Sequence, residues 1–332
     1  MVKSILMIKL GAAGDVLRTT CILQGLKEQH PDAGITWITK PFSKPLLAYN
    51  SLISQVVAVQ DISQLGSFDL VINLDEDELA CKFASKLRSG AEFKGFYWDE
   101  GVKFTEGAEP WFMMSALGPE PQNDVLKKEN KKTYQEHMLD IVGLKPEKSE
   151  TLYYMTEDDE QLTEEFREKI GPGYVIGFNT GAGSRWPLKR LSIEKTVKLA
   201  EHLSKDAKIV LFGGPEETER NKKIIGQAKC DIIDAGTDNT LRQFAAKLSA
   251  VDLLITSDTL ALHIRIALKK RIVAFFGPTS AAEVELYGLG EKVHADVECY
   301  CCYKKDPIAQ PSCADAITVE MILKAVERVR NV

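Results

Sequence analysis

The segment SILMIKLGAAGDV, residues Ser4–Val16, shows the pattern on which the whole chain is built. Ser4–Leu10 is a run of strand-forming residues, glycines follow it at positions 11 and 14, and a helical pattern begins at Val16. A buried strand that passes through a glycine-rich turn into a helix is typical of proteins in which strands and helices alternate. The segment therefore predicts an α/β protein with a parallel sheet.

The same alternation continues along both halves of the chain. Continuous apolar runs of this kind suit parallel strands that are covered by helices on both faces. In the first half we expect further strands at Ile35–Thr39, Gln55–Val59 and Asp69–Leu74, and helices at Val16–Gln29 and Glu78–Leu87. In the second half we expect strands at Tyr174–Asn179, Lys208–Phe212, Asp231–Asp234, Leu253–Ser257 and Ile272–Phe276, and helices at Ser192–Leu203, Glu216–Ala228, Leu241–Leu248, Thr259–Leu268 and Val319–Arg330. The prediction is two doubly wound α/β domains.

The length of the chain and its proline and glycine residues indicate where the boundary between these domains lies. A chain of 332 residues corresponds to about two domains. Pro146, a charged helix at Glu157–Lys169 and the breaker Gly171–Gly173 separate the two series of strands. We expect an N-terminal domain over 1–155, a C-terminal domain over 156–315 and a helix over 316–332 that packs back on the N-terminal domain. Gly101–Lys132, with three prolines and the run KKENKK, is expected to be a solvated loop or a mobile segment that faces the acceptor.

Composition excludes several classes of protein. The net charge is 42 − 48 = −6, which argues against a nucleic-acid-binding protein. No apolar run approaches the roughly 20 residues that span a bilayer. Met1–Leu10 is interrupted by Lys9 and leads into turn residues, so we interpret it as a first strand and not as a signal peptide.

The turn after the first strand is the first candidate site. Its glycines are spaced G-x-x-G and an aspartate follows, so it is neither the dinucleotide fingerprint nor a Walker pattern. Small residues let a ligand approach the backbone, and a helix N-terminus attracts anions. Asp15 is interpreted either as the N-cap of the helix or as a general base at the carboxyl edge of the strand. The candidates for an acceptor or phosphate loop are Lys9, Gly11, Gly14 and Arg18.

Three loops of the second half carry the features of a nucleoside-diphosphate site. Asn179–Arg190 combines hydroxyls, glycines and cations, which suit a diphosphate, although a glycine-rich turn with surface cations is the plainer interpretation. Asp258 and Thr259 either cap the next helix or bind a phosphate, and a lone His263 on that helix is more often structural. A carboxylate after Gly213-Gly214 suits ribose hydroxyls. The donor-binding candidates are Thr180, Gly181, Gly183, Lys189, Glu216, Asp258, Thr259 and His263, and Arg185 is a candidate catalytic cation.

The ordered motifs resemble those of glycosyltransferase family 9, the ADP-heptose:lipopolysaccharide heptosyltransferases. They are K-x-G-x-x-G-D-V-L-R-T-T at 9–20, N-T-G-A-G-S-R-W-P at 179–187, F-G-G-P-E-E at 212–217 and S-D-T-x-x-x-H at 257–263. Two positions depart from the family pattern: Leu260 stands where glycine is usual, and Arg185 replaces a frequent lysine. The resemblance implies the GT-B fold, two facing Rossmann-like domains with the donor in the second, the acceptor in the first and no essential metal.

The resemblance also implies roles for individual residues. The base falls on Asp15, the cation on Arg185, the hydroxyl ligand on Thr180 and the ribose carboxylate on Glu216, and the family's D-T-G-x-x-H motif falls on Asp258, Thr259 and His263. The expected reaction is an inverting transfer of heptose from ADP-heptose to a lipopolysaccharide core or another surface glycan. Arg185, with Lys189 or Arg190, stabilises the leaving nucleotide, and closure between the domains excludes water. The expected location is cytoplasmic, at the inner face of the membrane.

Two other classes of function remain open from the sequence. A different GT-B nucleotide-sugar enzyme, such as an epimerase, needs a donor but no acceptor, so its product distinguishes it. A non-catalytic nucleotide-sugar-binding protein keeps the motifs of the second half but has no need of Asp15.

Four cysteines precede the last helix, at Cys299, Cys301, Cys302 and Cys313. Four thiolates hold zinc or iron tetrahedrally, although only Cys299 and Cys302 have the spacing of a metal knuckle. The resemblance includes relatives that modify autotransporters and carry iron in this part of the chain. A structural zinc or iron site and a set of buried thiols are the two interpretations.

Overall fold

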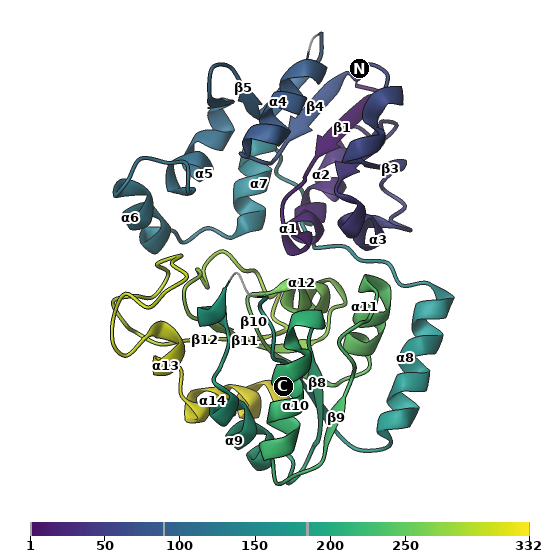
Figure 1. Cartoon of the computed structure of the whole chain (residues 1–332). Helices are drawn as coiled ribbons and strands as arrows, with labels where there is room; N and C mark the ends of the chain where they lie inside the picture. The colour runs from purple at the N-terminus through teal and green to yellow at the C-terminus, as the bar shows by residue number, and fades with distance from the viewer. Residues whose placement is uncertain (1, 89, 184–185, 332) are drawn as a thin grey trace. The chain divides into compact units, whose positions relative to one another are not determined.

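The computed structural model describes residues 2–88, 90–183 and 186–331, and it divides into two compact units, Met1–Tyr154 and Met155–Val332 (Figure 1). Within each unit, strands and helices alternate along the chain as the sequence predicts. The division lies next to the expected boundary between residues 155 and 156.

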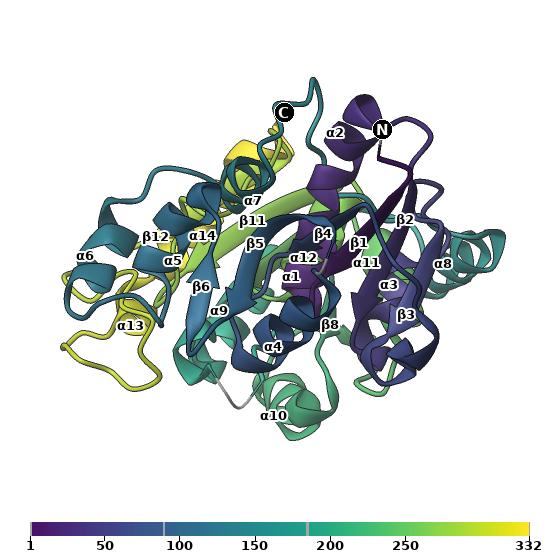
Figure 2. The same cartoon turned by 90° about the horizontal axis from the view of Figure 1, so that it is seen from above.

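Unit 1 contains a six-stranded sheet with the order β3-β2-β1-β4-β5-β6, which Figure 2 shows side by side. All neighbours pair in parallel except β5 and β6, which are antiparallel. The strands are β1 Ser4–Ile8, β2 Gly34–Thr39, β3 Gln55–Ala58, β4 Leu70–Asn73, β5 Glu92–Trp98 and β6 Val102–Phe104. The helices are α1 Ala13–Arg18, α2 Ile22–Gln29, α3 Lys44–Leu47, α4 Glu78–Leu87, α5 Glu109–Met114, α6 Gln122–Glu129 and α7 Tyr134–Val142, with short 3-10 turns at Thr19–Cys21, Pro41–Ser43, Val59–Gln64 and Glu106–Ala108.

Unit 2 contains a second six-stranded sheet, all parallel, with the order β12-β11-β10-β7-β8-β9. Its strands are β7 Val175–Asn179, β8 Lys208–Phe212, β9 Ile232–Asp234, β10 Leu253–Ser257, β11 Arg271–Phe276 and β12 Gly290–His294. Its helices are α8 Glu157–Ile170, α9 Ile193–Leu203, α10 Thr218–Gln227, α11 Leu241–Ser249, α12 Leu260–Ala267, α13 Cys313–Ala316 and α14 Val319–Arg330, with 3-10 turns at Pro187–Lys189 and Pro215–Glu217. The two doubly wound parallel sheets confirm the predicted fold class.

The core of each unit lies on both faces of its sheet. On the two faces of β1, alternate residues enter different apolar clusters, with Ile5 and Met7 in one and Leu6 and Ile8 in the other. All four side chains are fully buried. Strands that are apolar on both faces require helices on both, which is why the sequence shows continuous apolar runs instead of alternation.

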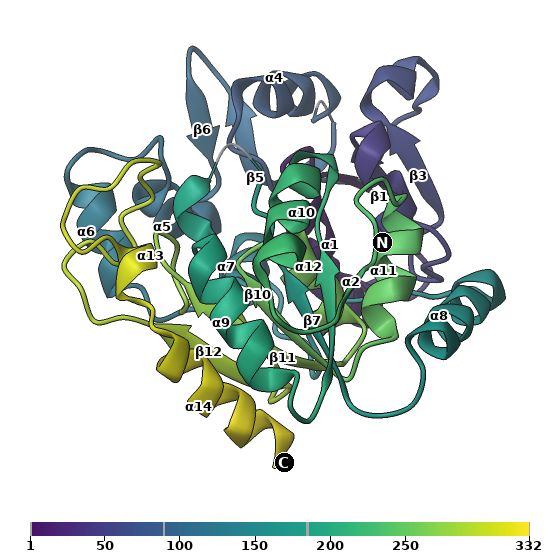
Figure 3. The ribbon, with the colours of Figure 1, turned by 60° about the horizontal axis from the view of Figure 1, so that its bottom comes forward.

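The last helix belongs to unit 2. Its buried residues Ile322, Ala325 and Val326 join the core formed by the strands of the second sheet, and Figure 3 shows α14 beside α9. Residues 316–332 therefore belong to unit 2, and the expectation that they pack back on the N-terminal domain stays a prediction. Among the described residues, no helix is both long and apolar enough to cross a membrane.

The segment Gly101–Lys132 is not the irregular loop that we expected. It forms β6, a 3-10 turn, α5 and α6. Trp111 and Phe112 of α5 pack against the core of unit 1, and Lys127 of the KKENKK run is buried to nine-tenths. The sequence did not predict these two helices, because helices of six and eight residues are too short to show a clear periodic pattern of apolar residues.

Candidate active site

Each sheet has one point at which the winding of the chain changes direction. In unit 1 it lies between β1 and β4, and in unit 2 between β7 and β10. Open α/β sheets bind ligands outside the carboxyl ends of the strands at such a point. Asp15 comes shortly after β1, Asn179 ends β7, and Asp258 directly follows β10, so sequence candidates lie at both switch points.

In unit 2, Asn179 ties the two sides of the switch point together. Its side-chain amide donates to the backbone oxygen of Gly181 at 3.0 Å and lies 3.2 Å and 3.1 Å from the hydroxyls of Thr256 and Thr259. Thr259 is at the N-cap position of α12, but its side chain makes no cap hydrogen bond. The hydroxyl of Thr259 is thus held by neighbouring polar groups at the helix N-terminus, where anions bind favourably.

Asp258 and Lys189 form an ion pair beside this helix. The Lys189 ammonium lies 2.9 Å from a carboxylate oxygen of Asp258 and also donates to its backbone oxygen at 2.9 Å. His263 Nε2 is 3.5 Å from the other carboxylate oxygen, and the three side chains are largely buried. The structure thus brings together three of the predicted donor-binding residues. Their ligand-binding roles stay predictions.

A buried polar network supports the glycine-rich loop after β7. The hydroxyl of Thr180 donates to Asn221 Oδ1 at 2.5 Å, and Asn221 is fully buried. The Glu217 carboxylate lies under Gly181, so close that a Cβ on this glycine would be 2.4 Å from the Glu217 carboxyl carbon. One oxygen of Glu217 accepts from the backbone N–H of Gly214 at 2.9 Å, and the other has no hydrogen-bond partner among the residues that the structure describes.

The two consecutive glutamates differ in their surroundings. Glu216, the predicted ribose ligand, is exposed, and its carboxylate faces the position that a Cβ on Gly183 would take, at 3.6 Å. Gly183 has a φ of +66°, a conformation that favours glycine. Sequence reasoning missed Glu217. The signal was present in the repeated acid of G-G-P-E-E, but only the fold shows which of the two is buried.

Arg185, the predicted cation for the diphosphate, lies outside the described residues. Its loop leads into a cavity of about 440 Å³ that is lined by Arg190, Arg220 and Lys223, among others. Burial, and then the charge of Arg190, lowers the pKa of Arg220. These cations gather close to the end of the predicted diphosphate loop, where their charge is suited to an anionic group.

In unit 1, Asp15 lies in the first turn of α1 and is not its N-cap. The N-cap position belongs to Ala12, which makes no side-chain cap bond. Arg18 Nη2 lies 2.8 Å from the Asp15 carboxylate, and its guanidinium carbon is 3.6 Å from the centre of the Tyr134 ring. Gly14 is buried within the same short helix. The plainer interpretation of Asp15 as a helix cap is therefore wrong.

The backbone of α1 is tied to α7 through two hydroxyls. Thr19 donates to the backbone oxygen of Asp15 at 2.6 Å, so the hydroxyl of Tyr134, 2.6 Å away, must donate to Thr19. Burial raises the pKa of Tyr134 to about 12, which keeps the phenol protonated for this role. The turn that carries Asp15 is thus held in place from the side of α7.

Lys9 points inward instead of toward a ligand. Its ammonium lies 2.8 Å from Asp75, which follows β4, and donates to the backbone oxygen of Leu74 at 2.5 Å. Both charged side chains are almost completely buried. The structure therefore places Lys9 in an internal ion pair at the switch point, and its role in an acceptor or phosphate loop stays without support.

An aromatic cluster adjoins this ion pair. The indole N–H of Trp111 donates to Glu76 at 3.2 Å, and the Trp111 ring meets the Tyr134 ring edge to face, with 5.4 Å between the ring centres. Burial raises the pKa of Glu76, and the charge of Lys9 acts in the opposite direction. Sequence reasoning missed Glu76 and Trp111, because they come from two segments that only the fold brings together.

The four cysteines near the C-terminus are all buried. Burial first, and then the neighbouring Cys299 and Cys302, raises the pKa of Cys313 to about 12. Within the described ranges, no group of three or more His, Cys, Asp or Glu residues is placed to hold a metal ion. The described arrangement of Cys299, Cys301, Cys302 and Cys313 therefore lends no support to the zinc or iron site, which stays a prediction.

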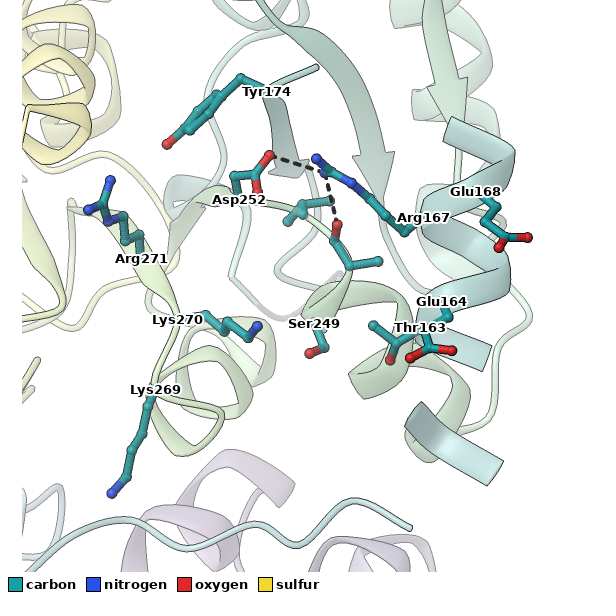
Figure 4. Close-up of a pocket in the computed structure, with 12 residues that line it drawn as sticks. Thr163, Glu164, Arg167, Glu168, Tyr174, Ser249, Asp252, Lys269, Lys270 and Arg271 are labelled. Carbon is teal, nitrogen blue, oxygen red and sulfur yellow. Dashed lines mark hydrogen bonds and ion pairs between the residues drawn. The ribbon is translucent and has the colours of Figure 1, made fainter. Parts of the chain in front are cut away.

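A larger cavity, of about 650 Å³, lies at the end of the second sheet where its strands begin (Figure 4). It is lined by residues that precede or begin strands, such as Tyr174, Asp252 and Arg271. Arg167 points into this region and pairs with Asp252 at 3.1 Å. None of the predicted site residues lines it, and it faces the amino ends of the strands, away from the switch point.

The sequence of the chain is similar to those of known proteins. The model of "Glycosyltransferase family 9 (heptosyltransferase)" matches residues 111–311. A lipooligosaccharide heptosyltransferase 2 of Haemophilus influenzae is 25% identical over 315 residues, which cover 83% of this chain and 84% of that protein. A lipooligosaccharide heptosyltransferase 2 of Campylobacter jejuni (strain 81116) is 26% identical over 161 residues, 46% of this chain. The chain spans about half the length, 51%, of that relative.

The fold is similar to that of a solved structure of the same family. A glycosyl transferase family 9 protein from Veillonella parvula superposes with a TM-score of 0.79 at 21% identity, over 98% of this chain and 97% of that one. Because the family model matches well over half of the residues, the chain belongs to glycosyltransferase family 9, the heptosyltransferase family.

Proposed function

We propose that this protein is an inverting glycosyltransferase that moves a heptose from ADP-heptose to a sugar hydroxyl of a lipopolysaccharide core. The observation that carries the proposal is the Asp15 carboxylate. It lies past the carboxyl end of β1, at the switch point of the first sheet, in a chain that belongs to family 9. Because the acceptor is attached to a lipid, the reaction takes place at the cytoplasmic face of the membrane.

The donor half of the proposal is supported by the switch point of unit 2. Thr259 presents a hydroxyl at the N-terminus of α12, and Thr180 lies on the glycine-rich loop after β7. Glu216 is exposed beside Gly183, where a carboxylate suits ribose hydroxyls, while the buried Glu217 packs against Gly181 of the loop. Backbone N–H groups, hydroxyls and a carboxylate are the groups that recognise a nucleoside diphosphate.

The chemistry assigned to Asp15 is general-base catalysis. The carboxylate takes the proton of the acceptor hydroxyl, the hydroxyl oxygen forms a bond to the anomeric carbon of the donor, and the bond from that carbon to the phosphate oxygen breaks. The configuration inverts because attack and departure occur on opposite faces. Arg18, 2.8 Å from Asp15, keeps the carboxylate oriented.

The departing ADP accumulates negative charge, which cations stabilise in the transition state. Arg185 has this role in the proposal, with Arg190 close behind it in the same loop. No metal ion is needed for this step if these cations neutralise the diphosphate.

Product analysis tests the proposal directly. The protein is incubated with ADP-heptose and a lipopolysaccharide core acceptor that lacks the heptose, and the products are followed by mass spectrometry. We expect release of ADP and an acceptor heavier by one heptose residue, linked with inverted configuration. A changed sugar nucleotide without acceptor indicates an epimerase-like enzyme. Tight binding without any product indicates a binding protein, and either result overturns the proposal.

A further inference from the structure

We propose that the carboxylate of Asp75 is a built-in anion that fills the turn between β1 and α1, positions Asp15 and keeps phosphate groups out of this turn. The inference rests on the proposed function, in which Asp15 takes the proton of the acceptor hydroxyl. Asp75 acts through the backbone of the turn and is therefore a positioning residue.

The first step concerns the backbone N–H groups of the turn. The N–H of Leu10 and the N–H of Gly11 both donate to the same oxygen of Asp75, Gly11 at 3.2 Å. In open α/β folds, the N–H groups of the turn after the first strand are where ligands place an anionic group. In this chain the position is taken by a carboxylate from the neighbouring strand end.

The second step concerns the charge that accompanies this carboxylate. Lys9 lies 2.8 Å from the second oxygen of Asp75 and bonds to the backbone oxygen of Leu74. Both side chains are about 95% buried, so each charge depends on the other. The backbone of Asp75 is itself held by Asn73, which accepts from its N–H at 3.2 Å and donates to its carbonyl at 3.0 Å. The anion is thus rigidly placed and already neutralised.

The third step links this pair to Asp15. A Cβ on Gly11 would lie 3.2 Å from an oxygen of Asp75 and 3.6 Å from an oxygen of Asp15. The two carboxylates therefore lie close to the same residue, Gly11, which has no side chain to separate them from its backbone. Among the described residues, the charged or titratable groups near Asp15 include Lys9 at the end of β1, Arg18 on α1 and Tyr134 on α7, together with Asp75 after β4.

This arrangement indicates the chemical class of the group that binds beside Asp15. A phosphate of the acceptor would meet two carboxylates and find both turn N–H groups occupied. An uncharged sugar hydroxyl meets neither obstacle and donates its proton to Asp15. The acceptor is therefore a glycan that presents a neutral hydroxyl to this turn, with any phosphate bound elsewhere.

The first test removes the built-in anion and supplies another. Asp75→Ala leaves room for a small carboxylate in the turn, so we expect transfer to fall about 100-fold and to recover at least tenfold in sodium formate, at constant ionic strength. The larger acetate should restore less, and chloride nothing. Asp77→Ala is the matched control, because it removes an exposed carboxylate that caps α4. It should respond to formate no more than the unchanged protein. Absence of a formate response specific to Asp75→Ala overturns the proposal.

The second test uses pH profiles, which a purely structural role would not move in opposite directions. Asp75→Asn leaves the Lys9 charge uncompensated near Asp15, so the acid limb of kcat/KM should shift to lower pH. Lys9→Met leaves the Asp75 charge, so the limb should shift to higher pH, and the double variant should return toward the original position. Asp75→Asn fills the turn and should not respond to formate. Loss of activity with an unmoved acid limb in both single variants contradicts the proposal.

A readout without catalysis separates this inference from the proposed function. The melting temperature of Asp75→Ala should rise by several degrees in formate or inorganic phosphate, because the vacated turn binds either anion. The unchanged protein and Asp77→Ala should show no such rise. If the protein transfers no heptose yet this shift is found, the proposed function fails and the built-in anion stands. If transfer is found and the shift is not, the inference alone fails.

Discussion

Three carboxylates lie around the buried ammonium of Lys9, and each has different surroundings. Asp75 is paired with Lys9 at 2.8 Å and is taken up by backbone N–H groups. Glu76 is held by the indole of Trp111, and burial raises its pKa. Asp15 keeps about a third of its side chain exposed and is oriented by Arg18. Of the three, Asp15 combines an oriented carboxylate with access for an acceptor, as a general base requires.

Replacing Asp15 by asparagine tests this role. Asn keeps the shape of the side chain but is not a base at neutral pH, so we expect transfer to fall by roughly 10²–10⁴-fold. ADP affinity should be unchanged, and the melting temperature should change little, because a partly exposed ion pair with Arg18 contributes about 1 kcal/mol or less. Transfer rate, calorimetric ADP affinity and thermal unfolding are measured on one preparation. Near-normal transfer would remove Asp15 from the mechanism.

Replacing Gly181 by alanine tests whether Glu217 supports the glycine-rich loop after β7. Alanine there would place its Cβ 2.4 Å from the carboxyl carbon of the buried Glu217, so the loop or the glutamate must shift. We expect Gly181→Ala to lose about 1–3 kcal/mol of stability, as overpacking does, and to weaken ADP binding by about tenfold, equivalent to roughly 1.4 kcal/mol. Gly226→Ala, in α10, is the control. A Cβ there meets nothing within 4 Å, so stability should be unchanged or should rise. Equal behaviour of the two variants would contradict the role of Glu217.

Among the elements, α7 carries side chains that the site depends on. It begins at Thr133 with a capping box completed by Glu136 and ends at Gly143, whose φ is +71°. Its first residue, Tyr134, reaches Thr19 and supports Arg18, and His137, one turn later, lies against the Trp111 ring. A helix that is fixed at both ends presents these side chains at constant positions.

The buried His137 gives α7 a pH dependence. Burial, and then the charge of Lys132, lowers its pKa to about 4, below the 6.5 expected in the unfolded chain. Below pH 6.5 the unfolded chain takes up a proton that the folded state does not, so stability falls as pH drops from 6.5 toward 4. Between pH 7 and pH 5, His137→Gln should lose about 1 kcal/mol less than the unchanged protein. Urea unfolding at both pH values measures this. His202→Gln, an exposed histidine in α9, is the control and should retain the full pH dependence.

For the molecule as a whole, the two units repeat one design. Each has the same order of strands about its first strand. Asp15 and Asp75 follow the two strands that flank the switch point of unit 1, and Thr180 and Asp258 follow those of unit 2, whereas Glu216 and Glu217 follow β8. Unit 1 carries the Asp15 carboxylate beside the Lys9–Asp75 ion pair, and unit 2 carries hydroxyls, cations and glutamates. The proposed function assigns the acceptor hydroxyl to unit 1 and the nucleotide to unit 2.

Removal of metal ions tests whether the stability and the activity of the protein depend on a bound metal. In the described part of the chain no group of metal ligands is assembled, and the Cys313 thiol has its pKa raised to about 12. We therefore expect dialysis against a chelator to leave both the melting temperature and the transfer rate unchanged. Elemental analysis of the purified protein should find less than stoichiometric zinc and iron. A stoichiometric metal whose removal lowers the melting temperature would restore the metal interpretation of the cysteines.

Strands and long helices were predictable because their signals are local. The expected strands at Lys208–Phe212 and Leu253–Ser257 coincide with β8 and β10, and the helices at Glu78–Leu87 and Val319–Arg330 coincide with α4 and α14. β5, β6, β12 and the helices α3, α5, α6 and α7 were not predicted. β12, α5 and α6 are short, and a short segment carries too few residues for a periodic pattern to be recognised.

The fold class, the family resemblance and the loops that carry the candidate residues could all be predicted, because apolar runs and glycine turns depend on residues that are close in the chain. Which side chains meet depends on the folded structure. It placed Asp75 in the turn of Asp15, 60 residues away in the chain, turned Lys9 inward, and made Glu217 the buried acid and Glu216 the exposed one. Burial and long-range ion pairing arise when distant strand ends become neighbours in a sheet. No local pattern specifies them.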